Sequence, residues 1–159
     1  MTIMVDTGVL YALFDRSDVH HLDSLALLTD ALEGRFGALY TTDFVVLESA
    51  LLLKGRGGPA MARAMIRLLK RGGISVLLLD DEVYAAALEL FDERAETLSL
   101  CDAASLALMK RLDIRSLASY DERSFRGMAK QVIGGGYFQS LEEPRRKLIV
   151  ALDKTRTPK

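Results

Sequence analysis

The sequence predicts an α/β protein, a three-layer sandwich around a mainly parallel central sheet of four or five strands. Short runs typical of β-strands alternate with longer segments whose apolar residues recur at helical spacing. This alternation favours strands joined by crossover helices, and therefore a parallel sheet. The run Ile74–Leu79 is the clearest strand, and its apolar character suits a sheet covered on both faces. A chain of 159 residues is long enough for one domain with a substantial core.

The first elements follow from short local patterns. Thr2–Val5 is the first expected strand, and a short helix is expected directly after it, ending near Phe14. Apolar residues at helical spacing predict a helix over Val19–Leu32, with Asp18 as its N-cap. A second strand, Ala38–Tyr40, is expected next.

Two further helices precede the clearest strand. Asp43–Leu53 is nearly all apolar and predicts a helix with its first residue as N-cap. The glycines and the proline of Gly55–Pro59 are expected to break it. An amphipathic helix then follows over Met61–Leu69 and is closed by Gly72 and Gly73.

The second half of the chain continues the alternation. Asp80 and Asp81 are expected to begin a helix whose apolar stripe runs from Val83 to Phe91. The remaining expected elements are a helix at Asp102–Leu112, a strand at Ser116–Ala118, a short helical turn at Asp121–Met128 and an edge strand at Val132–Ile133.

Three consecutive glycines, Gly134–Gly136, mark the expected boundary between a domain at 1–136 and a C-terminal extension at 137–159. Apolar residues between Leu141 and Leu152 predict a short amphipathic helix in this extension. The final TRTPK is expected to be disordered.

Composition excludes several classes of protein. The formal net charge is −1, so no overall charge identifies a partner. The single cysteine, Cys101, excludes an intramolecular disulfide framework and a cysteine-rich zinc site. No apolar run approaches the roughly 20 residues that a membrane span needs, and no signal peptide is evident. We therefore expect a soluble, cytoplasmic protein with no membrane association.

Carboxylates follow the expected strands at corresponding positions. Asp6 ends the first strand, Asp121 follows the strand at Ser116–Ala118, and Asp102 opens a helix. Ligands of open α/β sheets gather at the carboxyl ends of the strands. If these strands are parallel and adjacent, the three carboxylates converge on one edge. Helix capping is the plain alternative for each of them.

Glu48 is the most informative single acid. It lies in the middle of an expected helix, with Phe44, Leu51 and Leu52 as apolar neighbours at helical spacing. Capping does not explain it, so it either faces water or lies in a polar pocket. Burying an unpaired carboxylate costs several kcal/mol, so burial would demand a cation or hydrogen-bond donors.

Taken as a set, these acids point to a metal ion. Converging carboxylates repel one another by about 4 kcal/mol per close pair at an effective dielectric constant near 20. Without a cation the cluster would raise its own pKa values and destabilise the fold. Ligands that are all oxygen atoms suit Mg²⁺ or Mn²⁺ and not zinc.

Four segments carry a resemblance to a known family: VDTGVLYALFD, TTDFVVLESALLL, LSLCDAASLALMKRL and ASYDERSF. In their order and spacing the chain, from about Thr2 to Ile133, resembles PIN-domain ribonucleases, specifically the VapC-type toxins of toxin–antitoxin pairs. The DVHH stretch at Asp18–His21 is also similar to that family.

The resemblance implies a metal-dependent endoribonuclease that hydrolyses single-stranded RNA with Mg²⁺ or Mn²⁺, forms a homodimer and is silenced by a cognate antitoxin protein. The implied catalytic and metal-binding residues are Asp6, Glu48, Asp102 and Asp121. Thr7 and Ser105 match positions that the family often fills with small or hydroxyl residues, and would fix the geometry of the carboxylates. The C-terminal extension is longer than the family pattern, and its role stays open between packing, dimerisation and RNA contact.

A local cluster of cations offers a site for the RNA backbone. Between Ser49 and Leu79 the chain contains no Asp or Glu. Arg63, Arg67 and Arg71 recur every four residues, which places them on one helix face. This stripe is a candidate for neutralising backbone phosphates, and a merely solvated helix face is the alternative.

Other interpretations differ in testable ways. A haloacid-dehalogenase-like phosphatase would need a second acid where the chain has Gly8. A receiver-type signalling domain would need a paired acid and a late lysine, and neither is clear. A catalytically weak PIN-fold RNA-binding or scaffold protein need not keep all four acids.

His20 and His21 are adjacent, so their side chains diverge by about 100° on a helix and make poor co-ligands for a metal ion. Capping or packing is expected of them.

Overall fold

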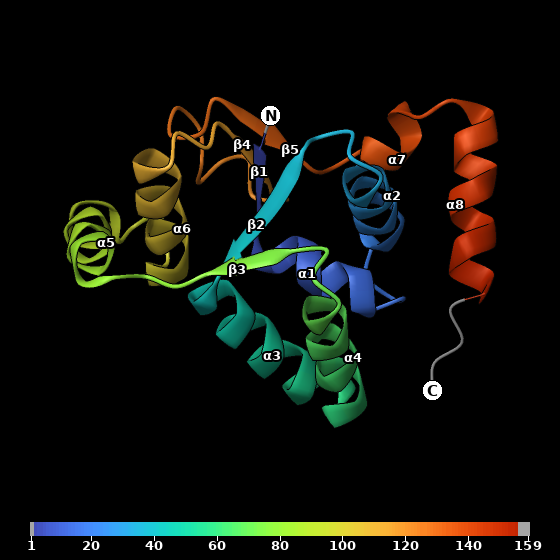
Figure 1. Cartoon of the computed structure of the whole chain (residues 1–159), viewed down its shortest axis with the longest axis horizontal. Helices are drawn as coiled ribbons and strands as arrows, with labels where there is room; N and C mark the ends of the chain where they lie inside the picture. Colours follow the sequence, from blue (N-terminus) through green and yellow to red (C-terminus); the bar gives the residue numbers. More distant parts are fainter. Residues whose placement is uncertain (1, 156–159) are drawn as a thin grey trace.

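Five parallel strands form the centre of the molecule. The structure is a computed structural model that describes residues 2–155 (Figure 1). The strands pair in the order β3-β2-β1-β4-β5, all in parallel, which confirms the expected α/β class. They are β1 (Thr2–Val5), β2 (Ala38–Thr42), β3 (Ser75–Leu77), β4 (Ser116–Ala118) and β5 (Gln131–Ile133).

Helices cover both faces of this sheet and complete the three layers. They are α1 (Thr7–Phe14), α2 (His21–Leu32), α3 (Asp43–Gly57), α4 (Pro59–Lys70), α5 (Asp81–Arg94), α6 (Leu100–Arg111), α7 (Tyr137–Ser140) and α8 (Glu143–Thr155). Helices α5 and α6 lie on one side of the sheet, and α1 to α4 lie on the other (Figure 1). Helix α8 lies outside α2, beyond the sandwich itself.

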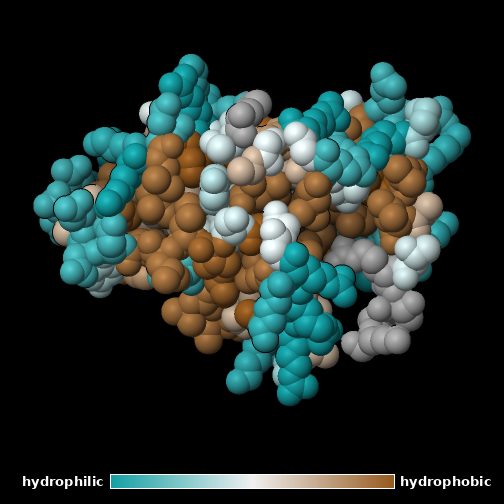
Figure 2. Space-filling model, viewed as in Figure 1, coloured by the Kyte–Doolittle hydropathy of each residue, from teal (hydrophilic) through white to brown (hydrophobic). Residues whose placement is uncertain are grey.

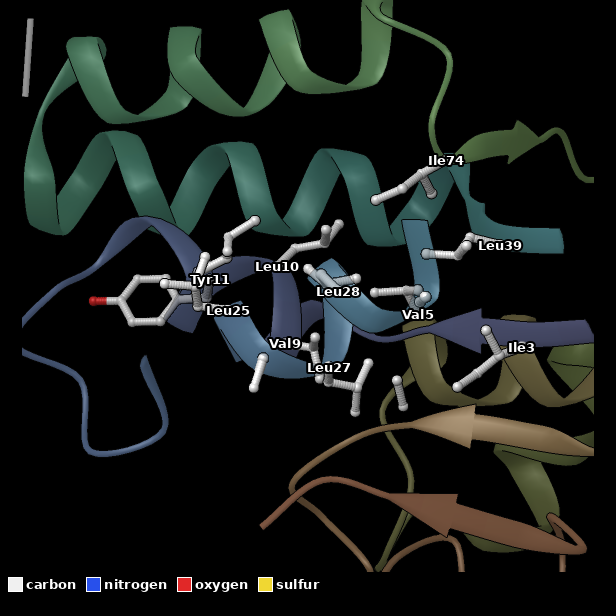
Figure 3. Close-up of a cluster of buried hydrophobic side chains, with 14 of the residues drawn as sticks. Ile3, Val5, Val9, Leu10, Tyr11, Leu25, Leu27, Leu28, Leu39 and Ile74 are labelled. Atoms are coloured by element: carbon white, nitrogen blue, oxygen red, sulfur yellow. The ribbon is translucent and has the colours of Figure 1, made fainter. Parts of the chain in front are cut away.

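The central strand β1 shows how the sequence produces two cores. Side chains alternate between the faces of a strand, so Ile3 and Val5 enter the core under α1 to α4, while Met4 enters the core under α5 and α6. All three are fully buried. Figure 3 shows Ile3 and Val5 packed with Val9 and Leu10 of α1 and neighbouring side chains. Each buried side chain of this size contributes about 1.5–3 kcal/mol, so both faces of β1 stabilise the sheet.

The start of α2 differs from the sequence prediction. The helix begins at His21, and the preceding Val19 is 89% exposed. Asp18 is not the N-cap: its Oδ1 accepts the backbone N–H of His20 at 2.8 Å and closes a turn before the helix. Such local side-chain bonds compete with helix formation, so a helical pattern that includes Asp18 overextends the helix.

The boundaries of α3 also differ. The hydroxyl of Thr42 caps this helix by accepting the N–H of Val45 at 3.1 Å, so Asp43 is not the cap. The helix continues through Gly55 to Gly57, and Gly58, whose φ is 84°, is its C-cap. One glycine in a helix costs about 1 kcal/mol relative to alanine, which the packing of α3 against α4 outweighs.

Two acidic segments were also predicted imperfectly. Helix α6 begins at Leu100 after the cap Ser99, and Asp102 is its third residue. The segment 121–128 forms turns and no helix. Asp121 bonds the N–H and the hydroxyl of Ser124, which holds a turn without extending it.

The strand expected to be buried on both faces is an edge strand. β3 covers only Ser75–Leu77 and pairs with β2 alone. Val76 is 39% exposed and Leu78 is 74% exposed. Apolar composition indicates a strand but does not report its place in the sheet, so the prediction of two covered faces was wrong. The exposed side chains of this strand leave an apolar surface at this edge of the sheet.

The C-terminal extension packs against α2. Leu141 and Ile149 are buried in the core shared with α1 to α4. Asp30 of α2, only 2% exposed, accepts hydrogen bonds from Arg145 and from the hydroxyl of Tyr137. The division of the chain at residue 136 stays a prediction. Residues 156–159 of the TRTPK end lie outside the described residues.

Within residues 2–155, none of the helices combines the length and the apolar character that crossing a membrane requires.

Candidate active site

Ser119 joins two of the expected acids at the carboxyl edge of β1 and β4. These strands are neighbours, and the N–H of Asp6 donates to the carbonyl of Ala118 at 3.0 Å. The Ser119 hydroxyl donates to Asp6 Oδ2 at 2.7 Å and accepts the N–H of Asp121 at 3.1 Å. Parallel pairing therefore brings Asp6 and the Asp121 backbone to one hydroxyl.

Thr7 joins Asp6 to Glu48. Its N–H donates to Asp6 Oδ1 at 2.7 Å, which makes Asp6 the N-cap of α1. Its hydroxyl donates to Glu48 Oε2 at 2.5 Å, across to the second turn of α3. Glu48 is half-buried. Glu48 therefore keeps some contact with solvent and also has a polar partner, which lies between the two possibilities that the sequence left open.

The other two acids keep bonds within their own segments. Asp102 Oδ2 accepts the N–H of Ser99 at 2.8 Å, and the Ser99 hydroxyl accepts the N–H of Asp102, which forms a capping box. Asp121 accepts the N–H of Ser124 at 3.0 Å and its hydroxyl at 2.6 Å. Asp102 therefore takes part in helix capping and Asp121 holds a turn, yet the charges of Glu48 and Asp121 still act on Asp102.

Electrostatics show that these carboxylates influence one another. Burial raises the pKa of Asp6 to about 6, and the charges of Asp102 and Glu48 add to this rise. The hydrogen bonds from Ser119 and Thr7 oppose it only in part. Burial also raises the pKa of Asp102, with further contributions from the charges of Glu48 and Asp121. The acids thus share one region of negative potential that a cation would relieve.

The chemistry of this donor set fits a hard divalent cation, because all of its donors are oxygen atoms. Within residues 2–155, however, no three Asp, Glu, His or Cys side chains form a ready ligand cluster. Asp102 and Asp121 also hold bonds within their own segments, and a carboxylate has enough lone pairs to keep such a bond while it coordinates a cation.

Buried hydroxyls accompany the acids. Ser105, one helical turn after Asp102, is 1% exposed, and its hydroxyl has no hydrogen-bond partner in the described part of the chain. The same holds for Ser49, the neighbour of Glu48. A buried polar group without a partner costs free energy, so these two hydroxyls are left unsatisfied in the described part of the chain.

Sequence reasoning missed Ser119, Ser99 and Ser124. Ser119 carries the most readable signal, because it precedes Asp121 by two residues in an extended segment, where residues two apart face the same side. The Ser99–Asp102 pair matches the spacing of a capping box. Reading hydroxyls at these offsets from each acid would have found them.

The cation stripe lies on α4. Arg63, Arg67 and Arg71 are exposed, and none of them bonds a carboxylate among the described residues. Hydrophilic side chains gather over α4 in Figure 2. Arg67 and Arg71 also border a groove of about 380 Å³. Its wall is mainly apolar and comes from α1, α2, α4, the residue before β3, and α8. The lining residues are Leu13, Phe14, Leu25, Leu28, Thr29, Leu32, Ala64, Leu68, Ile74, Leu152 and Thr155.

Comparison with known proteins gives concordant matches. The family model described as PIN domain matches residues 3–131. A VapC ribonuclease of Archaeoglobus fulgidus is 34% identical over 154 residues, covering 96% of this chain and 95% of that protein. Ribonuclease VapC26 of Mycobacterium tuberculosis is 28% identical over 137 residues, covering 86% of this chain and 97% of that protein.

A solved structure shares the fold. The crystal structure of VapC20 of Mycobacterium tuberculosis, a sarcin–ricin-loop-cleaving toxin, matches with a TM-score of 0.69 at 23% identity. The match covers 80% of this chain and 97% of that chain. The three-layer arrangement around a parallel sheet is therefore shared with a known toxin structure.

Proposed function

Because a family model covers most of its length and a relative is 34% identical across nearly all of it, this chain belongs to the PIN-domain family, and we propose that it is a VapC-type endoribonuclease toxin. Its substrate in this proposal is single-stranded RNA, whose phosphodiester bonds it hydrolyses with Mg²⁺ or Mn²⁺. A cognate antitoxin protein silences it. Its cytoplasmic location stays a prediction.

The observation that carries this proposal is the mutual influence of the acids at the carboxyl edge of β1 and β4. Asp6, Glu48 and Asp102 would hold the ion, and Asp121, the most exposed of the set, would hold a second ion or orient the attacking water. A bound divalent ion supplies an activated water and neutralises phosphate charge.

The chain's own residues prepare this site. Thr7 and Ser119 hold both oxygens of Asp6, and Thr7 also holds Glu48, so their orientations are fixed before substrate arrives. Burial keeps Asp6 away from water, which strengthens its interaction with any cation. Ser105 supplies a free hydroxyl one turn from Asp102.

Cleavage of single-stranded RNA in Mn²⁺ by wild type and by Asp6→Asn tests the proposal. Loss of cleavage in Asp6→Asn is expected, because the substitution removes a charged ligand but keeps its shape. Asp92→Asn is the matched control, since Asp92 is an exposed acid of α5 with no bonded partner among the described residues. Wild-type cleavage by Asp6→Asn would contradict the role of Asp6, and no cleavage by wild type would favour the scaffold interpretation. The match to the PIN-domain model argues against the phosphatase interpretation.

We assign the α4 cations Arg63, Arg67 and Arg71 to backbone phosphates of the RNA. They are exposed, have no carboxylate partner among residues 2–155, and are spaced along one face of α4 and its C-cap. A solvated face remains the alternative, and salt dependence distinguishes the two.

We assign the apolar groove to the antitoxin. Its mainly apolar wall suits a protein segment better than RNA, and the two arginines at its rim favour acidic residues next to the apolar ones. Such a segment would cover Arg67 and Arg71 and so remove them from RNA. The antitoxin segment and the RNA backbone would then compete for Arg67 and Arg71.

We assign the apolar edge to a second copy of the chain. Exposed apolar side chains gather where β3, α3 and α5 meet: Leu47, Leu51, Val76, Leu78, Tyr84 and Leu88. Figure 2 shows a continuous apolar area over β3 and α3. β3 is an edge strand, and a two-fold dimer would bring the same apolar patch of each copy together. Leu51→Glu should therefore halve the mass measured by light scattering, whereas Leu148→Glu on α8 should not.

A further inference from the structure

A stacked pair of rings at the same edge of the sheet as the acids has no role in the site described above. The rings of His20 and Tyr120 are parallel within 9°, with centroids 4.0 Å apart. Tyr120 stands in the chain between Ser119, which bonds Asp6, and Asp121. The pair therefore belongs to the same edge of the sheet as the acids.

Tyr120 is held on several sides. Its hydroxyl shares a hydrogen bond with the Ser24 hydroxyl at 2.6 Å and donates to the carbonyl of His20 at 3.3 Å. A Cβ on Gly134 would lie 2.0 Å from the Ser119 carbonyl oxygen and 3.1 Å from the Tyr120 ring, so only glycine fits there. This close packing fixes the ring at this edge of the sheet, on the side that faces α2.

His20 is fixed on one side and open on the other. Its Nδ1 lies 3.5 Å from Asp23 Oδ2, and Asp23 also accepts the N–H groups of Gly136 and Phe138. The start of the C-terminal extension thus braces the residue that orients His20. The side chain of His20 is nevertheless 38% exposed, and its Nε2 has no hydrogen-bond partner in the described part of the chain.

We propose that the His20–Tyr120 pair is a stacking platform for an unpaired base of the RNA strand that enters the acid site. Packing alone explains the half-buried ring of Tyr120. It does not explain the ring of His20, which is stacked on Tyr120, partly exposed, and has an Nε2 without a hydrogen-bond partner among the described residues. Proteins that bind single-stranded RNA stack its bases on aromatic and histidine rings. The free Nε2 offers such a nucleotide one hydrogen bond. This proposal rests on the proposed function.

Binding of two oligomers to the Asp6→Asn protein in Mg²⁺ tests the platform without cleavage. One is fluorescent oligoadenylate, and the other has the same length with a tetrahydrofuran spacer in place of every nucleoside. His20→Ala should weaken oligoadenylate binding about tenfold and leave binding of the base-free oligomer unchanged. His20→Phe should keep oligoadenylate binding near that of the parent, and Val19→Ala, at an exposed neighbour, is the matched control.

His20→Leu separates stacking from folding, because it keeps an apolar side chain of similar size but lacks the ring. Weakening of oligoadenylate binding by His20→Leu, with an unchanged thermal midpoint, supports the platform. Equal weakening of both oligomers, or no weakening of either, overturns the platform alone and leaves the nuclease assignment to the cleavage assay. Failure of the parent protein to bind either oligomer overturns the platform, and the cleavage assay on wild type decides the RNA substrate separately.

Discussion

The hydroxyl of Thr7 lies 2.5 Å from Glu48 Oε2, and the backbone N–H of the same residue donates to Asp6. One residue at the start of α1 therefore orients the carboxylate next to it in the chain and a second one 41 residues further on. Ser119, which follows the neighbouring strand β4, donates its hydroxyl to the other oxygen of Asp6.

Thr7→Val removes the hydroxyl but keeps the shape of the side chain. We expect its RNA cleavage rate to fall about 10- to 100-fold, as when other residues that hold metal ligands are lost. Thr7→Ser restores the donor and should recover most of the rate. If the initial cleavage rate of Thr7→Val equals that of wild type, Thr7 does not position Glu48 for the reaction.

Asp6→Asn should stabilise the metal-free protein at pH 7. The pKa of Asp6 is raised from 3.8 to about 6 in the folded state, so the fold favours the neutral carboxyl. Stability from this group is fully present below pH 3.8 and is lost as the pH rises to about 6. The shift corresponds to at most about 3 kcal/mol. Thermal unfolding in chelator at pH 4 and pH 7 measures it.

The control for this prediction is Asp92→Asn, which should leave the pH dependence unchanged because Asp92 is exposed. An Asp6→Asn midpoint at or below that of wild type in chelator at pH 7 would contradict the buried, repelled state of this carboxylate.

Arg145→Ala should loosen the C-terminal extension. Arg145 bonds buried Asp30, which Arg35 and Tyr137 also bond, so the loss leaves Asp30 partly paired. We expect a loss of about 2–3 kcal/mol in unfolding free energy, below the 3–5 kcal/mol of a fully orphaned buried charge. Urea unfolding measures this loss, and Lys147→Ala, at an exposed position on the same helix, should cost under about 1 kcal/mol.

The same contacts predict an acid limit for the extension. Burial alone would raise the pKa of Asp30, but bonds from Tyr137, Arg145 and Arg35 outweigh it and lower that pKa. His21 and Arg16 likewise lower the pKa of Asp153 against its burial. Their stabilisation is present above pH 3.8 and is lost as the pH falls through the lowered values. Hydrogen exchange of the α8 amides measures this, as protection factors relative to the intrinsic exchange rate at each pH. Protection factors that stay unchanged far below pH 3.8 would contradict this acid limit.

Replacing Arg63 by Gln, alone or with Arg67, should make RNA binding less dependent on salt. Each phosphate contact that is lost reduces the slope of log affinity against log salt by about 0.7 for a single strand. Arg94→Gln, an exposed arginine of α5 on the other face of the sheet, is the control. A slope that stays at the wild-type value in the double variant means that the stripe is only a solvated face.

Local chemistry made much of this fold predictable. The capping of α1 by Asp6 and the strand at Ser116–Ala118 follow from patterns only a few residues long. The convergence of the acids needed one further rule, the shared carboxyl edge of neighbouring parallel strands. Thr7 was expected beside the acids from the family resemblance, and the structure shows its two hydrogen bonds.

Features that depend on distant packing were not predictable. The apolar run at Ile74–Leu79 looks the same for a central strand and for an edge strand, so its exposure had no local signal. Gly55 stays helical because α3 packs on α4, although glycine itself favours a break. Asp23 links His20 to the extension across more than a hundred residues, and no spacing rule reveals such a contact.

Titration calorimetry with Mn²⁺ on wild type and Asp6→Asn, each without RNA, tests the nuclease account most directly. A divalent ion should bind to the wild-type acids and bind at least about tenfold more weakly to Asp6→Asn, while Asp92→Asn keeps the wild-type affinity. Equal Mn²⁺ affinity in wild type and Asp6→Asn, or no binding to wild type at all, would contradict a cation held by Asp6 and its neighbours.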